Sequence, residues 1–365
     1  MKTGKLILSL LAFLGVLACE PATPEPDPYT DVFELTPATA EIPADGGIVR
    51  LKVSGTRDFH VSSKPDWADE PSVKGREITL SVGSNDSGAE RRGVLAVCDD
   101  QGTCLSCLLT QKAPAVAPEV NWEAPFTHRS VFFRFTATWC GWCPRMANSV
   151  AMAQEKNPGK LNLVNVHGYQ STLEFDQVGK LMDLYKIEGY PSGVVDGRRS
   201  VENYDNATTA NKIAQYIQET EDNYPVSSAI AFNSEIKGQK LEMDLFLYFR
   251  DAASYKLTVF LLEDGIVGHQ ENYEGKASDT YEHNHVLRTA LTNVLGDTMV
   301  IPEERTQEHK KYSVTVPKDY KTDHLKIMVI VQRAFGEQKK LSDGYGDYYV
   351  DNCAVAKAGE ACPLD

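Results

Sequence analysis

The sequence Thr-Trp-Cys-Gly-Trp-Cys-Pro at residues 138–144 decides most of the fold. Its two cysteines, Cys140 and Cys143, can close a disulfide if the second lies one helical turn after the first. The apolar stretch at residues 130–136 predicts a buried strand before the motif, and Pro144 suits the first turn of a helix after it. We therefore expect Cys140 at a helix N-terminus, where backbone N–H groups and the helix dipole favour a thiolate.

The residues around this motif alternate between strand and helix patterns. Helical spacing occurs at residues 144–156, 175–186 and 207–221, and strand patterns occur at residues 130–136, 161–166 and 192–196. A strand followed by a helix, repeated in this way, is the order of an α/β sheet with helices on both faces. We assign residues 126–224 to this domain.

The sequence Gly-Tyr-Pro-Ser at residues 189–192 lies just before the last of these strands. Thioredoxin-like folds have a cis-proline at this place, facing the dithiol, and a cis X–Pro bond is rare unless the structure holds it. With this proline, the motif at residues 139–144 and the order of elements, residues 126–224 resemble the thioredoxin superfamily. The resemblance implies that Cys140 is the attacking thiolate, that Cys143 is the resolving thiol, and that exchange needs no cofactor or metal. It also implies supporting roles for Trp139, Gly141, Trp142, Tyr190 and Pro191.

Two features depart from the thioredoxin pattern. Thioredoxins carry a buried acid six residues before the first cysteine, where it is thought to assist proton transfer, and this chain has Arg134 there. A cation that reached Cys140 would favour the thiolate. The Gly-Trp dipeptide between the cysteines also differs from the Gly-Pro of thioredoxin, and that dipeptide helps to set the reduction potential. The direction of exchange therefore stays open between reduction, oxidation and isomerisation.

Two segments with strand patterns flank this domain. Residues 31–112 contain short strand candidates and a hairpin turn at residues 99–102, which predicts a small all-β sandwich. Residues 113–125 are interpreted as a linker, and residues 225–352 return to strand patterns that predict a second sandwich. The expected fold class is a multidomain protein with a thioredoxin-like α/β core flanked by two all-β sandwich domains. Residues 353–365 are expected to be a tail.

The first β segment, residues 33–113, resembles the BACON domain of Bacteroidetes proteins. The resemblance rests on Gly46-Gly47, Pro65-Asp66-Trp67, Asn85, Arg92-Gly93 and Leu109-Thr110-Gln111. That family was named for suspected carbohydrate binding, so the resemblance implies a glycan as a partner. Trp67 would be the stacking platform, although we favour a place for it in the core. Residues 120–352 resemble Bacteroidetes outer-membrane lipoproteins with a thioredoxin-like core and a C-terminal sandwich, on residues 281–288 and Gly296-Asp297.

The N-terminal residues carry the features of an exported, lipid-anchored protein. Residues 1–18 hold two lysines before an apolar run, which predicts a signal peptide. Val-Leu-Ala-Cys at residues 16–19 resembles a bacterial lipobox, and the resemblance implies cleavage before Cys19 and acylation of that residue. Residues 19–30 are acidic and rich in proline, which predicts an extended tether. We expect attachment to the cell envelope at the outer membrane, on a face that the sequence leaves open. The alternative is a signal peptide that is cut elsewhere.

The net charge and the cysteine content reduce the number of functions that the chain can have. The formal net charge of −14 excludes a generally basic nucleic-acid-binding surface. There are eight cysteines, so an odd number remains if Cys19 carries lipid, and at least one is unpaired in a monomer. We expect a hairpin disulfide between Cys98 and Cys104, with Cys107 a buried thiol. Zinc is disfavoured because positions 104 and 107 of one strand point to opposite faces. The other suggested structural disulfide joins Cys353 and Cys362.

Three histidines are candidates for a functional role, two of them as metal ligands. His283 and His285 form a same-face pair if their segment is a strand. We favour a hydrogen-bonded loop or strand edge over a metal site there. His167 follows a predicted strand, and we favour a surface position for it over one beside the dithiol.

These observations predict an exported, membrane-anchored thiol–disulfide oxidoreductase. Its substrates would be cysteine-containing exported proteins, and a redox partner would reset the Cys140–Cys143 dithiol. The rival hypothesis is a non-catalytic surface lipoprotein that binds glycan or protein and keeps a structural disulfide in its thioredoxin-like core.

Overall fold

The computed structural model of the chain describes residues 32–202, 204–336 and 345–364. The predicted signal peptide, Cys19 and the tether at residues 19–30 lie outside these residues. The chain divides into two units, Met1–Ala115 and Val116–Asp365, and each is described by itself. Within the described residues, no helix combines the length and the apolar character that a membrane span requires.

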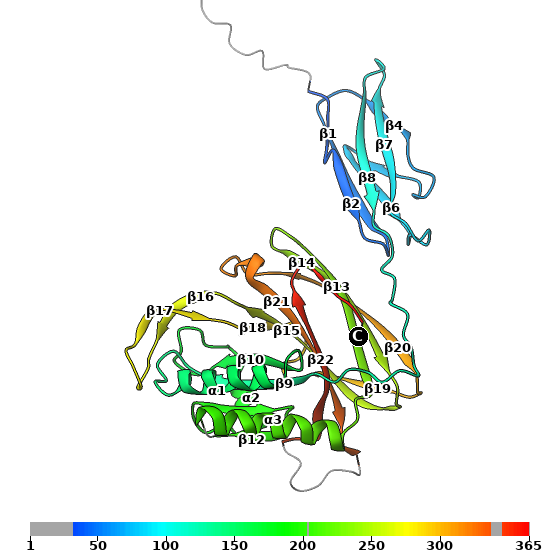
Figure 1. The fold of residues 1–365 in the computed structure, drawn as a ribbon. Coiled ribbons are helices and arrows are strands. Elements are labelled where there is room, and N and C mark those ends of the chain that lie inside the picture. Colours follow the sequence, from blue (N-terminus) through cyan, green and yellow to red (C-terminus); the bar gives the residue numbers. More distant parts are fainter. Residues whose placement is uncertain (1–31, 203, 337–344, 365) are drawn as a thin grey trace, which may run out of the picture. The chain divides into compact units, whose positions relative to one another are not determined.

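The first unit is a sandwich of two four-stranded sheets (Figure 1). One sheet has the spatial order β1 (Glu34–Thr36), β3 (Gly47–Ser54), β6 (Glu77–Val82) and β5 (Ser72–Lys74), and the other has the order β2 (Thr39–Ile42), β8 (Cys104–Gln111), β7 (Arg91–Asp99) and β4 (Phe59–Ser63). Buried and exposed residues alternate along β3 and β6, because each strand turns every second side chain toward the core. Trp67 packs against this core, which is the position favoured from the sequence. The Arg91 guanidinium lies 4.8 Å from the centroid of its ring.

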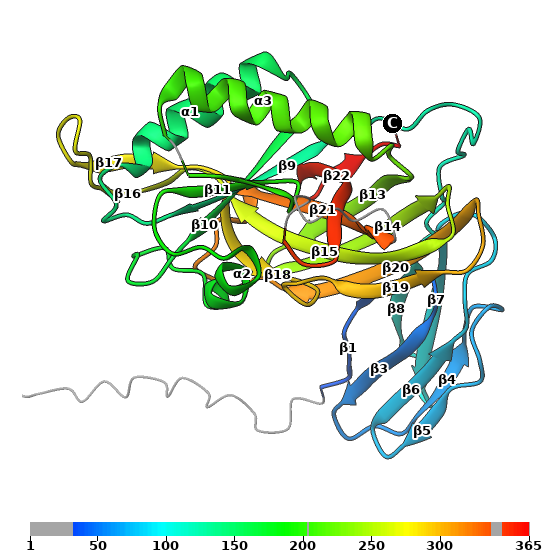
Figure 2. The ribbon, with the colours of Figure 1, turned by 90° about the horizontal axis from the view of Figure 1, so that it is seen from below.

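The second unit is built on a nine-stranded sheet. Its spatial order is β12 (Arg199–Val201), β11 (Ser192–Val195), β9 (Ser130–Thr136), β10 (Leu161–His167), β18 (Val286–Ala290), β15 (Ala253–Glu263), β21 (Leu325–Ala334) and β22 (Tyr348–Lys357), with β19 (Asp297–Ile301) paired to β15. β10 is parallel to β9, and β11 is antiparallel to it. Figure 2 shows α1 (Cys143–Lys156) and α3 (Asn206–Asn223) on one face and α2 (Val178–Tyr185) on the other. The predicted α/β arrangement is confirmed.

Both faces of β9 are buried, which is why most of its residues are apolar, with Arg134 as the charged exception. Phe132 packs in the cluster formed with α1 and α3, whereas Phe133 packs against Tyr185 of α2, with ring centroids 5.3 Å apart. α2 begins at Val178 rather than at residue 175, because Phe175 packs against this core from the turn that precedes the helix. Lys186, in the left-handed conformation with φ 55°, ends α2.

A second sheet packs over the later strands of the long one. Its order is β20 (Thr306–Thr315), β14 (Lys240–Phe249), β13 (Ser228–Lys237) and β23 (Ala361–Cys362). Leu245 of β14, Val259 of β15 and Val329 of β21 share the core between the two sheets, which is the predicted C-terminal sandwich. A 3₁₀ turn, η1 (Thr322–His324), precedes β21. The hairpin of β16 (Ile266–Gln270) and β17 (Ser278–His283) forms a separate two-stranded sheet that reaches toward the start of α1 (Figures 1 and 2).

The domain boundary expected after residue 224 does not separate two compact units. One core cluster contains Val131 of β9 together with Phe260 of β15 and Ile330 of β21. Asn165 of β10 also pairs with Val286 of β18, so the sheet continues from one segment into the other. The α/β part and the C-terminal sandwich therefore share one sheet and one core.

The cysteines pair only in part as expected. The structure contains the disulfides Cys98–Cys104 and Cys140–Cys143, and Cys107 is a buried free thiol. The predicted pairing of Cys353 with Cys362 is wrong, because both are free thiols. Cys353 lies inside β22 and faces the core shared with α2, whereas Cys362 of β23 packs against the core of the sandwich. Strands β22 and β23 thus replace much of the expected tail.

Candidate active site

The Cys140–Cys143 disulfide lies in the loop that joins β9 to α1. The N–H of Cys140 donates to the carbonyl of Ala137 at 3.1 Å, and the N–H of Cys143 donates to the carbonyl of Cys140 at 3.1 Å, so the loop turns directly into the helix. Pro144 stands in the first turn, where an N–H has no helical partner to bond. Cys140 therefore precedes a helix N-terminus, whose free N–H groups favour a thiolate at that position.

The proline predicted to face the dithiol is in place. The Tyr190–Pro191 peptide bond is cis, as expected from the sequence. Ser192 is paired with Phe135 of β9, so Pro191 lies beside the point where β9 enters the dithiol loop. Tyr190 packs against Cys140 and its neighbours, and burial raises the pKa of the tyrosine hydroxyl.

Aromatic side chains border this side of the dithiol. Trp139 is 46% exposed, its Nε1 donates to the carbonyl of Tyr169 at 3.0 Å, and its ring lies 5.7 Å from that of Tyr190. By contrast, Cys140 is only 4% exposed and Cys143 only 2%. Both sulfurs are therefore nearly buried, beside aromatic rings that are themselves partly exposed.

The opposite side of the loop is covered by residues 270–274, which begin at the last residue of β16 and which we call the strap. The N–H of Glu271 donates to the carbonyl of Thr138 at 2.8 Å, and the N–H of Tyr273 donates to the carbonyl of Gly141 at 2.9 Å. The strap is thus held by backbone hydrogen bonds, as an added strand would be.

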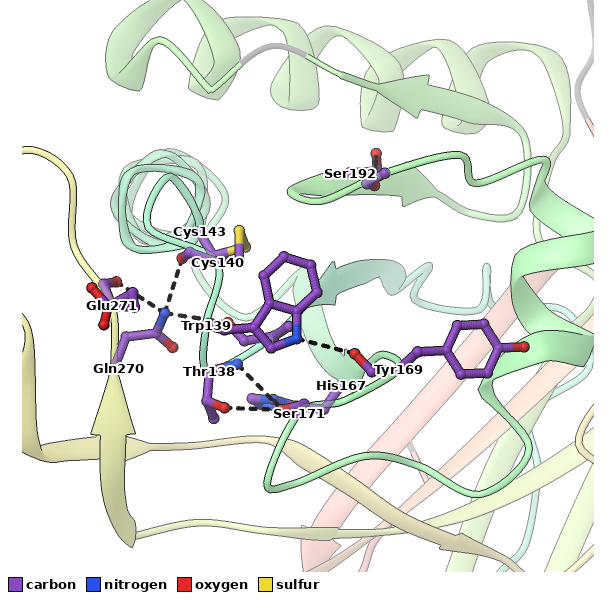
Figure 3. Close-up of a disulfide and its surroundings, with 12 residues drawn as sticks. Thr138, Trp139, Cys140, Cys143, His167, Tyr169, Ser171, Ser192, Gln270 and Glu271 are labelled. Atoms are coloured by element: carbon purple, nitrogen blue, oxygen red, sulfur yellow. Dashed lines mark hydrogen bonds between the residues drawn. A yellow bond between two sulfur atoms is a disulfide. The ribbon is translucent and has the colours of Figure 1, made fainter.

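Gln270 anchors the strap. Its side chain is buried, and its Nε2 donates to the carbonyls of Ala137 at 3.3 Å and Cys140 at 3.0 Å (Figure 3). The ring of Tyr273 lies so close over Gly141 that a Cβ at that glycine would be 2.3 Å from it. Gly141 therefore permits the close approach of the strap.

Ring contacts and an ion pair extend the contact with the strap. Trp142 lies edge-on to Tyr273, with ring centroids 5.5 Å apart, and stacks on Tyr204 at 5.7 Å. Arg145 Nη1 lies 2.8 Å from Glu274 Oε1. Trp142, predicted from the sequence to support the site, thus contacts the strap.

Arg134 and His167 belong to a buried polar cluster on β9 and β10. Arg134 is paired with Asn165 across the two strands, and the His167 ring lies 5.4 Å from that of His283. Among the described residues, Arg134 Nε, Asn165 Oδ1 and His167 Nε2 have no hydrogen-bond partner. Burial, together with the neighbouring His283 and Arg134, lowers the pKa of His167 well below its usual value.

Ser171 connects this cluster to the dithiol loop. Its Oγ lies 3.0 Å from His167 Nδ1 and accepts a hydrogen bond from the Thr138 N–H at 3.2 Å. His167 is therefore buried beneath the loop and not on the surface, contrary to the sequence-based interpretation. The loop or strand edge favoured for His283 and His285 is confirmed, because β17 ends at His283 and His285 lies between β17 and β18 with φ 52°. There its N–H donates to Asp264 Oδ1 at 2.7 Å.

The buried state of His167 predicts a pH-dependent stability. Below about pH 6.5 the unfolded chain protonates this histidine, whereas the folded chain does not, so the free energy of unfolding falls as the pH falls. This group contributes up to about 1.4 kcal/mol per pH unit. In denaturant titrations between pH 7 and pH 5, His167→Gln should therefore show a shallower slope than the wild type. An equal slope in both proteins would contradict the assignment.

Sequence reasoning missed the strap and the extent of the polar cluster. Gln270, Glu271 and Tyr273 lie in a polar segment without clear periodicity, and no local signal marks them. The only available signals for the cluster were Arg134 inside an apolar strand and the two histidines after residue 282.

Comparison with known families supports the interpretation of the α/β part. The profile of the thioredoxin family matches residues 115–219, which include the dithiol loop, α1 and cis-Pro191. The chain contains a thioredoxin domain. The profile of the outer membrane protein family Omp28 matches residues 179–341, which include the strap. This match indicates a protein of the cell envelope or outer membrane.

A solved structure agrees with the fold of the thioredoxin domain and its surroundings. HBP35 of Porphyromonas gingivalis is similar with a TM-score of 0.52 and 17% identity, over 64% of this chain and 76% of that one. A likeness at this identity shows the fold alone. A protein of Agrobacterium tumefaciens is similar with a TM-score of 0.40 and 15% identity, over 65% of this chain and 97% of that one. No curated protein matches the chain.

Proposed function

We propose that the protein is a thiol–disulfide oxidoreductase that acts through Cys140 and Cys143. The observation that carries this proposal is the Cys140–Cys143 disulfide at the start of α1. It lies next to cis-Pro191, within a thioredoxin domain. A structural disulfide needs neither the helix N-terminus nor the bordering proline and aromatic rings. Thiolate chemistry uses all of them.

The proposed exchange takes place in two steps. In the reducing direction, the Cys140 thiolate attacks one sulfur of a substrate disulfide and displaces the other sulfur as a thiolate. Cys143 then attacks Cys140, which closes the Cys140–Cys143 disulfide and releases the reduced substrate. The same steps run backwards when the chain donates its disulfide. Arg134 supplies a buried positive charge where thioredoxins have an acid, so a carboxylate does not take up the Cys143 proton from that position.

We further propose that substrates are cysteine-containing exported proteins and that a separate redox partner resets the dithiol. Support comes from the envelope family match and from the lipobox-like sequence that ends at Cys19. Acylation at Cys19 would hold the chain at the outer membrane. A glycan partner for the BACON-like segment rests on the sequence resemblance.

The test is a redox titration of the full chain. Glutathione buffers set the potential, alkylation traps the thiols, and mass spectrometry reports the Cys140–Cys143 peptide. We expect reversible opening in the folded protein, with a potential above about −200 mV for an oxidant or isomerase and near about −270 mV for a reductase. The burial of both cysteines favours the rival function, a binding lipoprotein with a structural disulfide. That rival predicts a potential below about −300 mV, or no opening without unfolding.

A further inference from the structure

The first unit carries a second disulfide, Cys98–Cys104, which lies on its sheet beside a histidine and a serine. Cys98 of β7 and Cys104 of β8 are direct partners across the antiparallel pair. Cys98 is also the direct partner of His60 on β4. Directly paired residues project from the same face of a sheet, so His60, Cys98 and Cys104 form a row across three strands. Ser62 Oγ lies 3.1 Å from Cys98 Sγ.

This row lies on the outer face of its sheet. His60 and Cys104 are exposed, and Cys98 is partly exposed. The core of the sandwich is built from the opposite faces of these strands, by residues such as Leu95, Val97 and Cys107. An incoming thiolate therefore has access to the Cys104 sulfur, and exposed disulfides are the more easily reduced ones.

The hairpin that holds the disulfide has other interactions to keep it folded. The β7–β8 pairing runs from Arg91 and Gln111 to the two cysteines. In the turn, Asp99 Oδ1 accepts the N–H groups of Gln101 at 3.0 Å and Thr103 at 2.7 Å. The Asp99 carboxylate also pairs with Arg57 at 2.7 Å, and this hydrogen bond lowers its pKa. The loop that the disulfide closes is short, and short loops gain the least stability from a crosslink.

The third cysteine in the described part of this unit, Cys107, lies apart from the Cys98–Cys104 pair. Cys107 is buried on the other face of β8, and burial raises the pKa of its thiol. Among the residues that the structure describes, opening of the Cys98–Cys104 bond thus leaves two neighbouring thiols and no third cysteine on that face of β8.

We propose that Cys98–Cys104 is a redox-active disulfide that a dithiol reductant opens. His60 assists the departure of Cys98 as a thiolate. A thiolate of the dithiol attacks Cys104 Sγ and forms a mixed disulfide, while Cys98 leaves as a thiolate beside the His60 imidazole. The second thiol of the reductant then attacks the mixed disulfide, becomes part of a disulfide itself and releases Cys104. Two electrons pass from the dithiol to the Cys98–Cys104 pair. This inference does not depend on the function proposed for Cys140 and Cys143.

The experiment follows the Cys98–Cys104 peptide in the full chain. Dithiothreitol serves as the dithiol reductant, followed by alkylation, mass spectrometry and circular dichroism. We expect this disulfide to open while residues 32–115 stay folded. In His60→Gln, reduced Cys98 should be alkylated about tenfold more slowly at pH 7, because less of its thiol is ionised without the neighbouring imidazole. Ser106→Ala, on the same exposed face of β8, is the matched control and should behave as the wild type.

Two results would overturn the inference. One is a Cys98–Cys104 bond that opens only when the first unit unfolds. The other is an alkylation rate in His60→Gln equal to that of the control. A transfer assay identifies the source of the dithiol: chains reduced at Cys140 and Cys143 are mixed with oxidised copies that carry Cys140→Ser and Cys143→Ser. Opening in those copies identifies this chain as a source of the dithiol, and opening by dithiothreitol alone excludes this chain's own dithiol as that source.

Discussion

Replacing Cys143 with serine should trap covalent complexes between Cys140 and its substrates. The first attack leaves the substrate bonded to Cys140, and only the resolving thiol releases it quickly. Without that intramolecular thiol, we expect release to slow by about 10³-fold or more, because its effective concentration is lost. Full-length Cys143→Ser should therefore give high-mass bands on non-reducing gels that disappear after reduction.

The matched control is Cys140→Ser, which keeps the loop and removes the attacking sulfur. It should trap nothing through this loop, and mass spectrometry of the crosslinked peptides distinguishes Cys140 from the exposed Cys104. If Cys143→Ser gave no more complexes than Cys140→Ser in its native compartment, the exchange function would lose its main support. A folded Cys143→Ser protein is expected, since serine is smaller than cysteine and Pro144 stands in the first turn of α1 either way.

Replacing Gln270 with leucine should loosen the strap over the dithiol loop. The change removes the two hydrogen bonds from Nε2 to the carbonyls of Ala137 and Cys140, although each carbonyl keeps a backbone N–H partner. We expect the strap to be held less tightly by about 1–2 kcal/mol. That loss raises the population of the open strap by a factor of about 5–30.

Hydrogen exchange at the amides of Glu271 and Tyr273 measures this effect directly. Both amides donate to the dithiol loop, so both should exchange faster by the same factor. In the reduced protein, alkylation of Cys140 should accelerate in parallel if the strap limits access to the sulfur. Gln307→Leu, at an exposed position of β20, is the matched control and should leave both rates unchanged. Unchanged exchange in Gln270→Leu would show that the backbone bonds alone hold the strap.

The part of the site that depends on local sequence was predictable. The apolar run of β9, the spacing of Cys140 and Cys143 and the proline before β11 each constrain neighbouring residues, and all three lie as predicted. The hairpin disulfide was also predictable, because the turn at Asp99 sets Cys98 and Cys104 opposite each other.

The part that depends on distant segments was not predictable. His167 is buried because a hairpin from much later in the chain brings His283 against it, and no periodicity of residues 161–167 reports that contact. The boundary after residue 224 failed for the same reason. Asn165 and Val286 pair in parallel across a long crossover, which a pattern of local elements does not reveal. The free Cys353 was placed in a tail because its strand follows a polar segment.

The shared core also means that the α/β part cannot complete its packing when it is first synthesised, because synthesis proceeds from the N-terminus. When residue 224 has emerged, β9, β10, β11 and β12 are present, but the apolar partners of Val131 on β15 and β21 have not yet been made. The N–H of Val350, which donates to the carbonyl of Asp196 at 2.9 Å, arrives later still. Residues 270–274 are also made after the dithiol loop, so the strap covers its side of that loop only once this later segment of the chain has been synthesised.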